Sequence, residues 1–172
     1  MNNLERNLID NILESDAKLD RLKDIVRHLR AEDGCPWDRE QTHVSLKPAV
    51  IEEAAEVICG INMLEKTGNS ENLKEELGDL LLQVLMHSQI AEEEGYFTLD
   101  DVIVGIAEKM IRRHPHVFGK EKISTSAEVL ENWEEIKKKE KEGKEAVNDY
   151  LPEAFNEAMA LIDTAKKRKG YC

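Results

Sequence analysis

The chain has 172 residues, about the length of one domain and enough to bury a core without disulfide or metal staples. Hydrophobic residues make up 41% and charged residues 35%, with 9 Gly and 4 Pro, which excludes collagen-like, low-complexity and wholly disordered classes. Aromatic residues make up only 5%, and this disfavours strand-rich folds. The formal charge of −12 repels nucleic acid and anionic lipid, so we expect neither as a partner.

The sequence also indicates where the protein resides. No apolar run approaches the roughly 18 to 20 residues that a membrane helix needs, and acids stand in the N-terminus where a signal peptide would be apolar. We therefore expect a cytoplasmic protein. Cys35, Cys59 and Cys172 form neither an even set nor a CxxC pair, which predicts reduced thiols, with Cys59 in a helix core.

Helical periodicity dominates from the first elements onward and predicts an all-α fold, an antiparallel helical bundle. A helix is expected over about 16–31. An ordered loop to His43 should follow, because Trp37 is costly to leave in water. The next helix is predicted over about 46–66, with Pro48 tolerated in its first turn. Its core-facing stripe is expected to hold Ile51, Ala54, Ala55, Ile58 and Ile61.

Three further helices and a last segment follow. A helix over about 71–94 is apolar on nearly all sides from Leu80 to Leu85, as expected of a helix buried centrally or at a subunit interface. Capping-box patterns at Thr98 and Thr125 begin helices that should run to Arg113 and to about 142. Pro152 is expected to start the last amphipathic segment. We read residues 1–172 as a single domain, with 143–172 as a C-terminal helix or tail.

Two pairs of carboxylates have the same three-residue spacing on neighbouring helices. Glu53 and Glu56 lie on one face of the second helix, and Glu76 and Asp79 on one face of the third. The short 67–70 connection makes these helices antiparallel neighbours, so the four acids can converge between them. Gathered carboxylates are costly without cations, and Mg²⁺, or Mn²⁺ in its place, suits an all-oxygen site. The alternative is that these stretches are simply solvated helix faces.

Basic and aromatic residues downstream supply a complement to the acids. Lys109 and Arg113 lie four apart on one helix face, and Lys137 follows Trp133 by four residues on the next helix. Such cations could hold the phosphates of a nucleotide, and Trp133 or Trp37 could stack on its base. Taken singly, the tryptophans are more often core residues, and the cations could merely offset the acidic surface.

Four motifs in chain order closely resemble the MazG family of nucleoside triphosphate pyrophosphohydrolases. The segments are Cys35-Pro36-Trp37-Asp38-Arg39-Glu40-Gln41-Thr42, Glu52-Glu53-Ala54-Ala55-Glu56, Glu76-Leu77-Gly78-Asp79 and Arg112-Arg113-His114-Pro115-His116-Val117-Phe118. The similarity spans about residues 19–142. The acidic pair is shared by a wider all-α pyrophosphatase superfamily, whereas the first and last segments are specific to MazG.

The resemblance implies hydrolysis of nucleoside triphosphates to the monophosphate and pyrophosphate with Mg²⁺. It implies metal ligands at Glu53, Glu56, Glu76 and Asp79. Glu52 is the extra acid of its motif and is implied either to hold a metal ligand in place or to act as a base that orients the attacking water. Glu52 and Glu53 are the candidate catalytic residues. Substrate-binding residues are implied at Lys109, Arg113, Trp133, Lys137 and Trp37. Some relatives carry a basic residue, expected to contact phosphate, four positions before the glutamate of the second acidic motif. This chain has Asn72 there, so that contact has no counterpart.

Two other readings share many of these residues. A helical module could bind a nucleotide or a partner protein without turnover, or a relative could be specialised for dUTP or phosphoribosyl-ATP. The apolar stretch of the third helix and the family resemblance together predict a homodimer or a higher homo-oligomer.

Overall fold

A computed structural model describes residues 18–119, 124–142 and 146–171, and these residues form helices and no strand. The chain divides into two compact units, residues 1–98 and 99–172, which are described in turn. The predicted all-α class is confirmed. Cys172 lies outside the described residues. No helix in the described part is long and apolar enough to cross a membrane.

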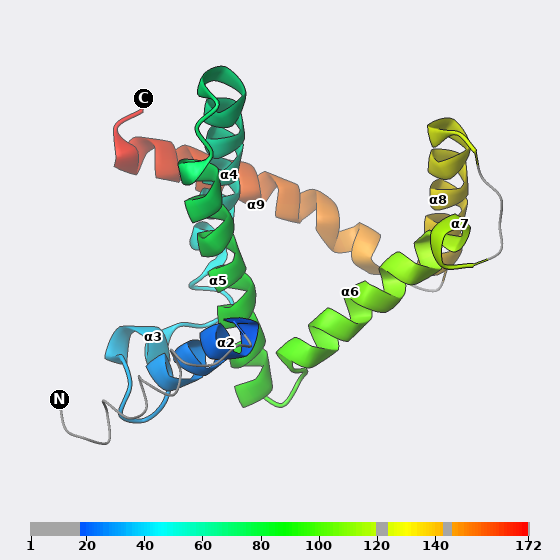
Figure 1. Cartoon of the computed structure of the whole chain (residues 1–172). Helices are drawn as coiled ribbons and strands as arrows, with labels where there is room; N and C mark the ends of the chain where they lie inside the picture. The colour runs from blue at the N-terminus through cyan, green and yellow to red at the C-terminus, as the bar shows by residue number, and fades with distance from the viewer. Residues whose placement is uncertain (1–17, 120–123, 143–145, 172) are drawn as a thin grey trace. The chain divides into compact units, whose positions relative to one another are not determined.

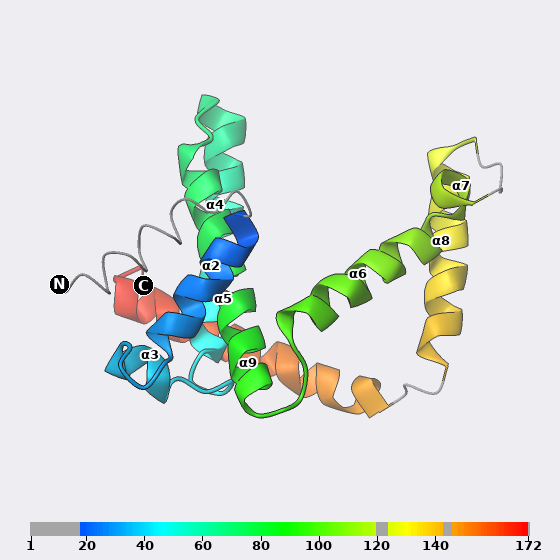
Figure 2. The same ribbon diagram turned by 60° about the horizontal axis from the view of Figure 1, so that its bottom comes forward.

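The first unit is organised around two long helices that pack against each other. These are α4 (Lys47–Thr67) and α5 (Glu71–Glu93), and they lie side by side in Figure 1. Gly68 ends α4 with a positive φ of 74°, a conformation that suits glycine, and lets the chain reverse within three residues. Helix α2 (Lys18–Leu29) packs on α5, as Figure 2 shows, and the short α3 (Pro36–Glu40) follows it.

The core of the first unit is formed where α2 and the beginning of α4 meet the second half of α5. Its buried apolar residues are Val26, Leu46, Leu85, Met86, Ile90 and Ala91. The buried residues on α5 recur at helical spacing, so this half of the helix presents a continuous apolar face to its neighbours. The first half of α5, which carries Glu76, lies outside this core.

Arg30 ties the α3 segment to α5. Its side chain is only 6% exposed, and it pairs with Glu93 at 2.7 Å while its Nη1 donates to the carbonyls of Asp38 and Gln41. The hydrogen bond from Arg30 holds the pKa of Glu93 below its usual range, despite the opposing effect of partial burial. The segment that connects α2 to α4 is therefore fixed by a charged side chain.

His43 and His87 form a second link between this segment and α5. Their Nδ1 atoms are 2.8 Å apart, the rings are inclined by 4°, and the ring centroids are 5.1 Å apart. A ring nitrogen lies about 1.1 Å from its own centroid, so these distances place the rings end to end in one plane, joined by an N–H···N hydrogen bond. Partial burial, and then the neighbouring His43, lower the pKa of His87.

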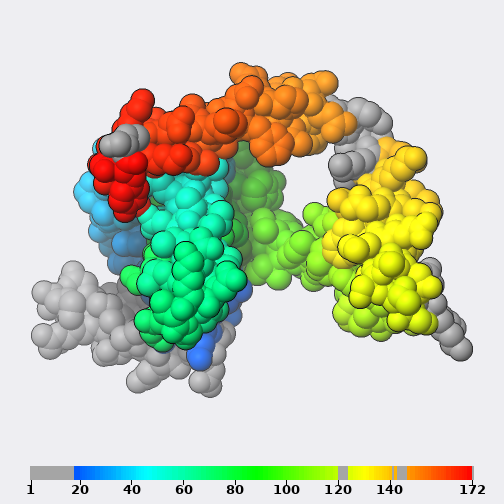
Figure 3. Space-filling view, turned by 90° about the horizontal axis from the view of Figure 1, so that it is seen from above, coloured from blue at the N-terminus to red at the C-terminus, as the bar shows by residue number. Residues whose placement is uncertain are grey.

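The second unit contains four described helices. They are α6 (Leu99–Arg113), α7 (Pro115–Phe118), α8 (Ser126–Lys141) and α9 (Ala146–Lys169). Both α7 and α8 pack on α6, and Figure 3 shows the yellow α8 against the end of α6. The predicted capping box of α8 is confirmed, because the Thr125 side chain accepts from the Glu128 backbone N–H and Glu128 caps in return.

Two local predictions are corrected. The expected loop before His43 contains the helix α3, and Trp37 is 63% exposed. Pro36 at the first helical position and Asp38 in the first turn favour this single turn, which is too short to show helical periodicity. Pro152 does not start the last helix but lies inside α9, which accommodates a proline at the cost of one backbone hydrogen bond.

The predicted core stripe of α4 is also only partly correct. Ile58 and Ile61 are 60% and 48% exposed, and Ala55 and Cys59 are exposed, whereas Ile51 and Ala54 are half-buried. On α5, Leu81 and Val84 are exposed while Leu85 is buried. The face that α4 turns toward α5 includes the buried Gly60, so several of its larger apolar side chains point elsewhere.

Candidate functional site

Gly60 sets the distance between the two helices that carry the acidic motifs. A Cβ atom built on Gly60 would lie 2.7 Å from the Leu73 Cα, which is closer than side-chain contacts allow. The backbones of α4 and α5 therefore approach each other at a point where only glycine fits. This close approach lies two turns from Glu53 and one turn from Glu76, so it helps to bring the two acidic motifs together.

Three of the four predicted metal ligands converge. One carboxylate oxygen from each of Glu53, Glu76 and Asp79 lies within 4.8 Å of the others. Glu53 comes from α4, and the other two lie one turn apart on α5. The predicted convergence of acids from two antiparallel helices is therefore present in the folded chain.

Glu76 is the most deeply placed acid of this group. Its residue exposure is 9%, and Asn72, one turn earlier on α5, donates to its Oε1 at 2.8 Å. Among the described residues, no cationic side chain pairs with Glu76. A buried carboxylate next to two others, with a neutral amide as its hydrogen-bond donor, is electrostatically costly until a cation joins it.

The donor set fits a hard divalent cation. Carboxylate oxygens are the ligands that Mg²⁺ and Mn²⁺ prefer, and Mg²⁺ commonly keeps several waters beside one or two carboxylates. The Oδ1 of Asn72 is buried without a hydrogen-bond partner, so the site also contains an acceptor that a bound water would satisfy. The residues present are therefore suited to a partly hydrated divalent ion.

The two remaining acids of the α4 motif lie next to this group. Glu52 and Glu56 are half-buried on α4, and both have polar partners in the fold. Neither belongs to the group of three whose oxygens lie within 4.8 Å. Their roles as an orienting acid and as a fourth ligand stay predictions.

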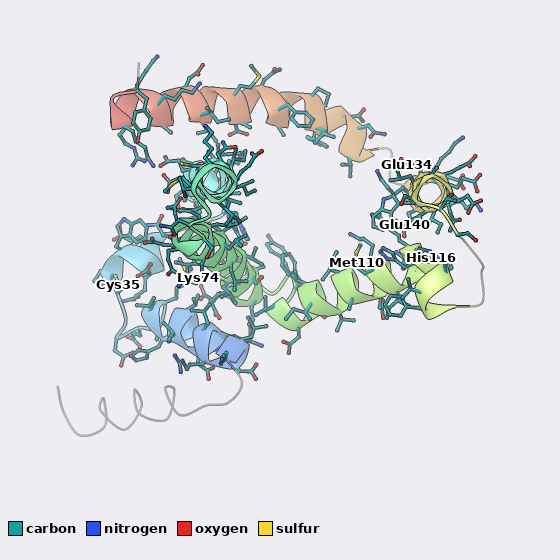
Figure 4. All side chains as sticks on the ribbon, turned by 45° about the horizontal axis from the view of Figure 1, so that its top comes forward. Cys35, Lys74, Met110, His116, Glu134 and Glu140 are labelled. Atoms are coloured by element: carbon teal, nitrogen blue, oxygen red, sulfur yellow. The ribbon has the colours of Figure 1, made fainter. Side chains whose placement is uncertain are left out.

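The second unit holds a cluster of the opposite sign. Arg113 donates to the Glu140 carboxylate through Nε at 3.0 Å and Nη2 at 2.6 Å, and Arg112 donates through Nε at 2.7 Å. Figure 4 shows Glu140 on the side of α8 that faces α6. The hydrogen bonds from Arg113, and then from Arg112, hold the pKa of Glu140 below its usual range. One carboxylate thus fixes the Nε edges of two guanidinium groups.

Aromatic rings complete this basic cluster. The Arg113 guanidinium lies 5.2 Å from the Trp133 ring centroid, and the His114 ring meets Trp133 edge-on at 4.9 Å. The Nδ1 of His114 bonds the Met110 carbonyl at 2.6 Å, which requires the proton on Nδ1. The structure therefore brings two of the predicted substrate-binding residues, Arg113 and Trp133, into contact.

The other predicted substrate-binding residues are placed as follows. Lys137 pairs with Glu134 on α8 at 2.9 Å, and Lys109 is half-buried on α6. Trp37 belongs to the first unit, on the exposed surface of α3. No contact among these three residues is described.

Two residues that these contacts single out were absent from the predicted site. Asn72 lies four residues before Glu76, a spacing at which side chains on a helix meet, so the hydrogen bond between them was detectable in principle. Glu140 follows Trp133 and Lys137 at a spacing that keeps all three on one face of α8. Its pairing with Arg113 joins residues 27 positions apart and could not be read from local spacing.

The comparisons with known proteins agree with the arrangement of these motifs. Residues 41–118 match the MazG nucleotide pyrophosphohydrolase domain. The chain is 49% identical over 159 residues to the nucleoside triphosphate pyrophosphohydrolase/pyrophosphatase MazG of Thermotoga maritima, covering 90% of the chain and 59% of that protein. It is 44% identical over 153 residues to the nucleoside triphosphate pyrophosphohydrolase of Escherichia coli K12, covering 88% and 56%.

A third relative is the Bacillus subtilis protein YabN, described as uncharacterized, which is 50% identical over 148 residues. That match covers 86% of the chain but 29% of YabN. The chain thus spans between about a third and three-fifths of these relatives. The matched region includes both acidic motifs and the basic end of α6. The chain therefore belongs to the MazG family.

Proposed function

We propose that this protein is a Mg²⁺-dependent nucleoside triphosphate pyrophosphohydrolase, which converts a nucleoside or deoxynucleoside triphosphate to the monophosphate and pyrophosphate. The observation that carries the proposal is the convergence of Glu53, Glu76 and Asp79 oxygens within 4.8 Å around a buried acid without a cationic partner among the described residues. The names of the Thermotoga and Escherichia relatives support the same reaction.

The acidic residues of α4 and α5 would have different roles in this reaction. Glu53, Glu56, Glu76 and Asp79 would hold the divalent ion, with Mn²⁺ a substitute for Mg²⁺. When bound, such an ion neutralises phosphate charge and lowers the pKa of a coordinated water. Glu52, next to Glu53 on α4, would hold a ligand in place or orient the attacking water.

The basic cluster would bind the substrate. Arg113 keeps its Nη1 unused by Glu140, so a phosphate oxygen can accept from it while the Nε edge stays fixed. Lys109 and Lys137 would add charge on the same two helices. The face of Trp133, or the exposed Trp37, would stack on the nucleobase.

The test is a substrate panel. The purified protein would be incubated with the standard ribonucleoside and deoxyribonucleoside triphosphates and Mg²⁺, with pyrophosphate release as the readout. We expect release from at least one substrate, and none after chelation or with Glu53→Gln at unchanged helicity. No pyrophosphate from any substrate at micromolar enzyme would refute the proposal.

The same panel separates the alternative functions. A binding module without turnover would retain nucleotide affinity when the divalent metal is chelated and would release no product. A relative specialised for dUTP or phosphoribosyl-ATP would turn over that one substrate. The convergent acids favour the hydrolase over the binding module, because such a module has no need for this costly group.

We also propose that two copies of the chain associate. Leu77, Leu81 and Val84 are 51%, 40% and 42% exposed and recur at helical spacing on α5, and Ile58 and Ile61 of α4 are exposed as well. A second copy is the partner that the resemblance implies for such a surface. Sedimentation at micromolar concentration should give at least twice the mass of the 19.6 kDa chain, and a monomer would contradict the proposal. The cytoplasmic location stays a prediction.

A further inference from the structure

Asn72 has one half of its side-chain amide engaged and the other half unsatisfied. Its Nδ2 donates to the Glu76 carboxylate at 2.8 Å, whereas its Oδ1 is buried and has no hydrogen-bond partner. A carboxylate accepts and does not donate, so the amide must present its NH₂ to Glu76 and cannot flip to relieve the oxygen. An unsatisfied buried acceptor of this kind costs about 1 to 3 kcal/mol.

The unsatisfied oxygen lies close to Glu76, one of the three converging acids. The nitrogen and oxygen of one amide are about 2.3 Å apart, so Asn72 Oδ1 is no more than about 5 Å from Glu76 Oε1. Glu76 is one of the three acids, with Glu53 and Asp79, whose oxygens lie within 4.8 Å of one another. No described side chain donates to Asn72 Oδ1, and its neighbours in the group are acceptors when ionised. The missing donor must therefore come from outside the described residues, and a bound water is a donor of the required kind.

We propose that Asn72 is a positioning residue of the cation site. Its NH₂ fixes the orientation of Glu76, and its Oδ1 accepts a hydrogen bond from a water in the hydration shell of the divalent ion. This inference rests on the proposed function, because it takes the ion to be held by Glu53, Glu76 and Asp79. A single kind of ligand, a divalent cation that retains water, accounts for the hydrogen bond from the NH₂ group to Glu76 and supplies a donor for Oδ1.

The experiment measures cation binding without any nucleotide. Free Mn²⁺ would be quantified by electron paramagnetic resonance in titrations of the wild-type protein and Asn72→Ala, with Mg²⁺ as a competitor. Loss of a residue that orients a ligand typically weakens metal affinity about 10- to 100-fold, and we expect Asn72→Ala to fall in that range.

A matched control separates this role from a general effect on the helices. Asn62 is an exposed asparagine on α4, so Asn62→Ala removes the same group without touching the acids. We expect its Mn²⁺ affinity to equal that of the wild type. Melting in EDTA checks folding. The rise in melting temperature on adding Mg²⁺ should shrink in Asn72→Ala and persist in Asn62→Ala.

The outcomes distinguish this inference from the proposed function. If the wild type binds Mn²⁺ and Asn72→Ala binds it equally well, the role of Asn72 is refuted and the cation site stands. If the wild type binds no Mn²⁺ at millimolar concentration, the cation site itself is refuted. If Asn72→Ala melts several degrees lower in EDTA, Asn72→Ser, which keeps a short polar group, is measured in its place under the same criterion.

Discussion

Two carboxylates at helix–helix contacts, Glu76 in the first unit and Glu140 in the second, have opposite electrostatic surroundings. Each is largely shielded from water, with Glu76 at 9% residue exposure and the Glu140 side chain at 17%. Arg112 and Arg113 neutralise Glu140 and hold its pKa low. Glu76 receives a hydrogen bond from the neutral Asn72 and lies against Glu53 and Asp79.

The difference indicates what each contact is for. A carboxylate that is paired with arginines of the same unit needs no further counter-charge, and it fixes the positions of those arginines. A shielded carboxylate beside other carboxylates carries an electrostatic cost, and a cation from solution would offset it. This contrast supports the proposal that the first unit takes up a metal ion, whereas Glu140 in the second unit already has arginines as its counter-charges.

The largest effect is expected from Glu76→Gln. The substitution keeps the size of the side chain and an oxygen that can accept from Asn72, but it removes the buried charge. We expect pyrophosphate release to fall at least about 100-fold, more than a change outside the ligand set typically gives. In EDTA the free energy of unfolding should rise by about 1 kcal/mol, because a shielded charge without a cation is removed. A variant that is both active and less stable would refute this reading of the acidic group.

Glu140→Gln should have the opposite effect on stability. The arginines lose their anionic partner, so the melting temperature should fall whether or not Mg²⁺ is present. If Arg113 holds phosphate as proposed, the KM should rise about 10-fold with little change in kcat, because the guanidinium is less well positioned. Glu135→Gln, an exposed change on the same helix, is the control and should match the wild type. A lower KM would instead mean that Glu140 competes with substrate for Arg113.

Gly60→Ala tests whether the acidic group depends on the close approach of α4 and α5. The added Cβ would meet the Leu73 backbone, which cannot move as a flexible side chain can. We expect a loss of about 1 to 3 kcal/mol in the free energy of unfolding. Gly78→Ala is the matched comparison, because a Cβ there meets nothing within 4 Å, and alanine should stabilise α5 by about 0.5 to 1 kcal/mol. Chemical denaturation in EDTA measures both, and equal effects would contradict the role of Gly60.

The sequence predicted local features well and orientations poorly. The capping box at Thr125 was found because both of its partners lie within four residues. The one-turn helix at Trp37 was missed because five residues show no periodicity. Ile58 was assigned to the core because the stripe of α4 was read from hydrophobicity alone. Which face meets α5 depends on the glycine contact at Gly60, and that contact involves the opposite helix.

The same limit applied to the site. Glu53, Glu76 and Asp79 were predicted to converge because a short connection and matched spacing determine the relation between α4 and α5. The partner of Arg113 was not predicted, because Glu140 reaches it through the packing of α8 on α6. Pairings within one helix, or between helices joined by a tight turn, are therefore readable from sequence, while pairings across a longer connection are not.

The smallest expected effect is the pH dependence of the Glu140 contact. Because the arginines lower the pKa of Glu140 in the folded chain, the stability that it contributes is present above its unfolded pKa of about 4.3 and is lost as the pH falls through the lower folded value. The difference in melting temperature between the wild type and Glu140→Gln should therefore be constant from about pH 7 to 5 and shrink below about pH 4. A carboxyl titration by NMR should place the midpoint of Glu140 below the ordinary value for a glutamate. A melting difference that grows on acidification would reverse the sign of this linkage and would mean that the arginines do not stabilise the ionised carboxylate.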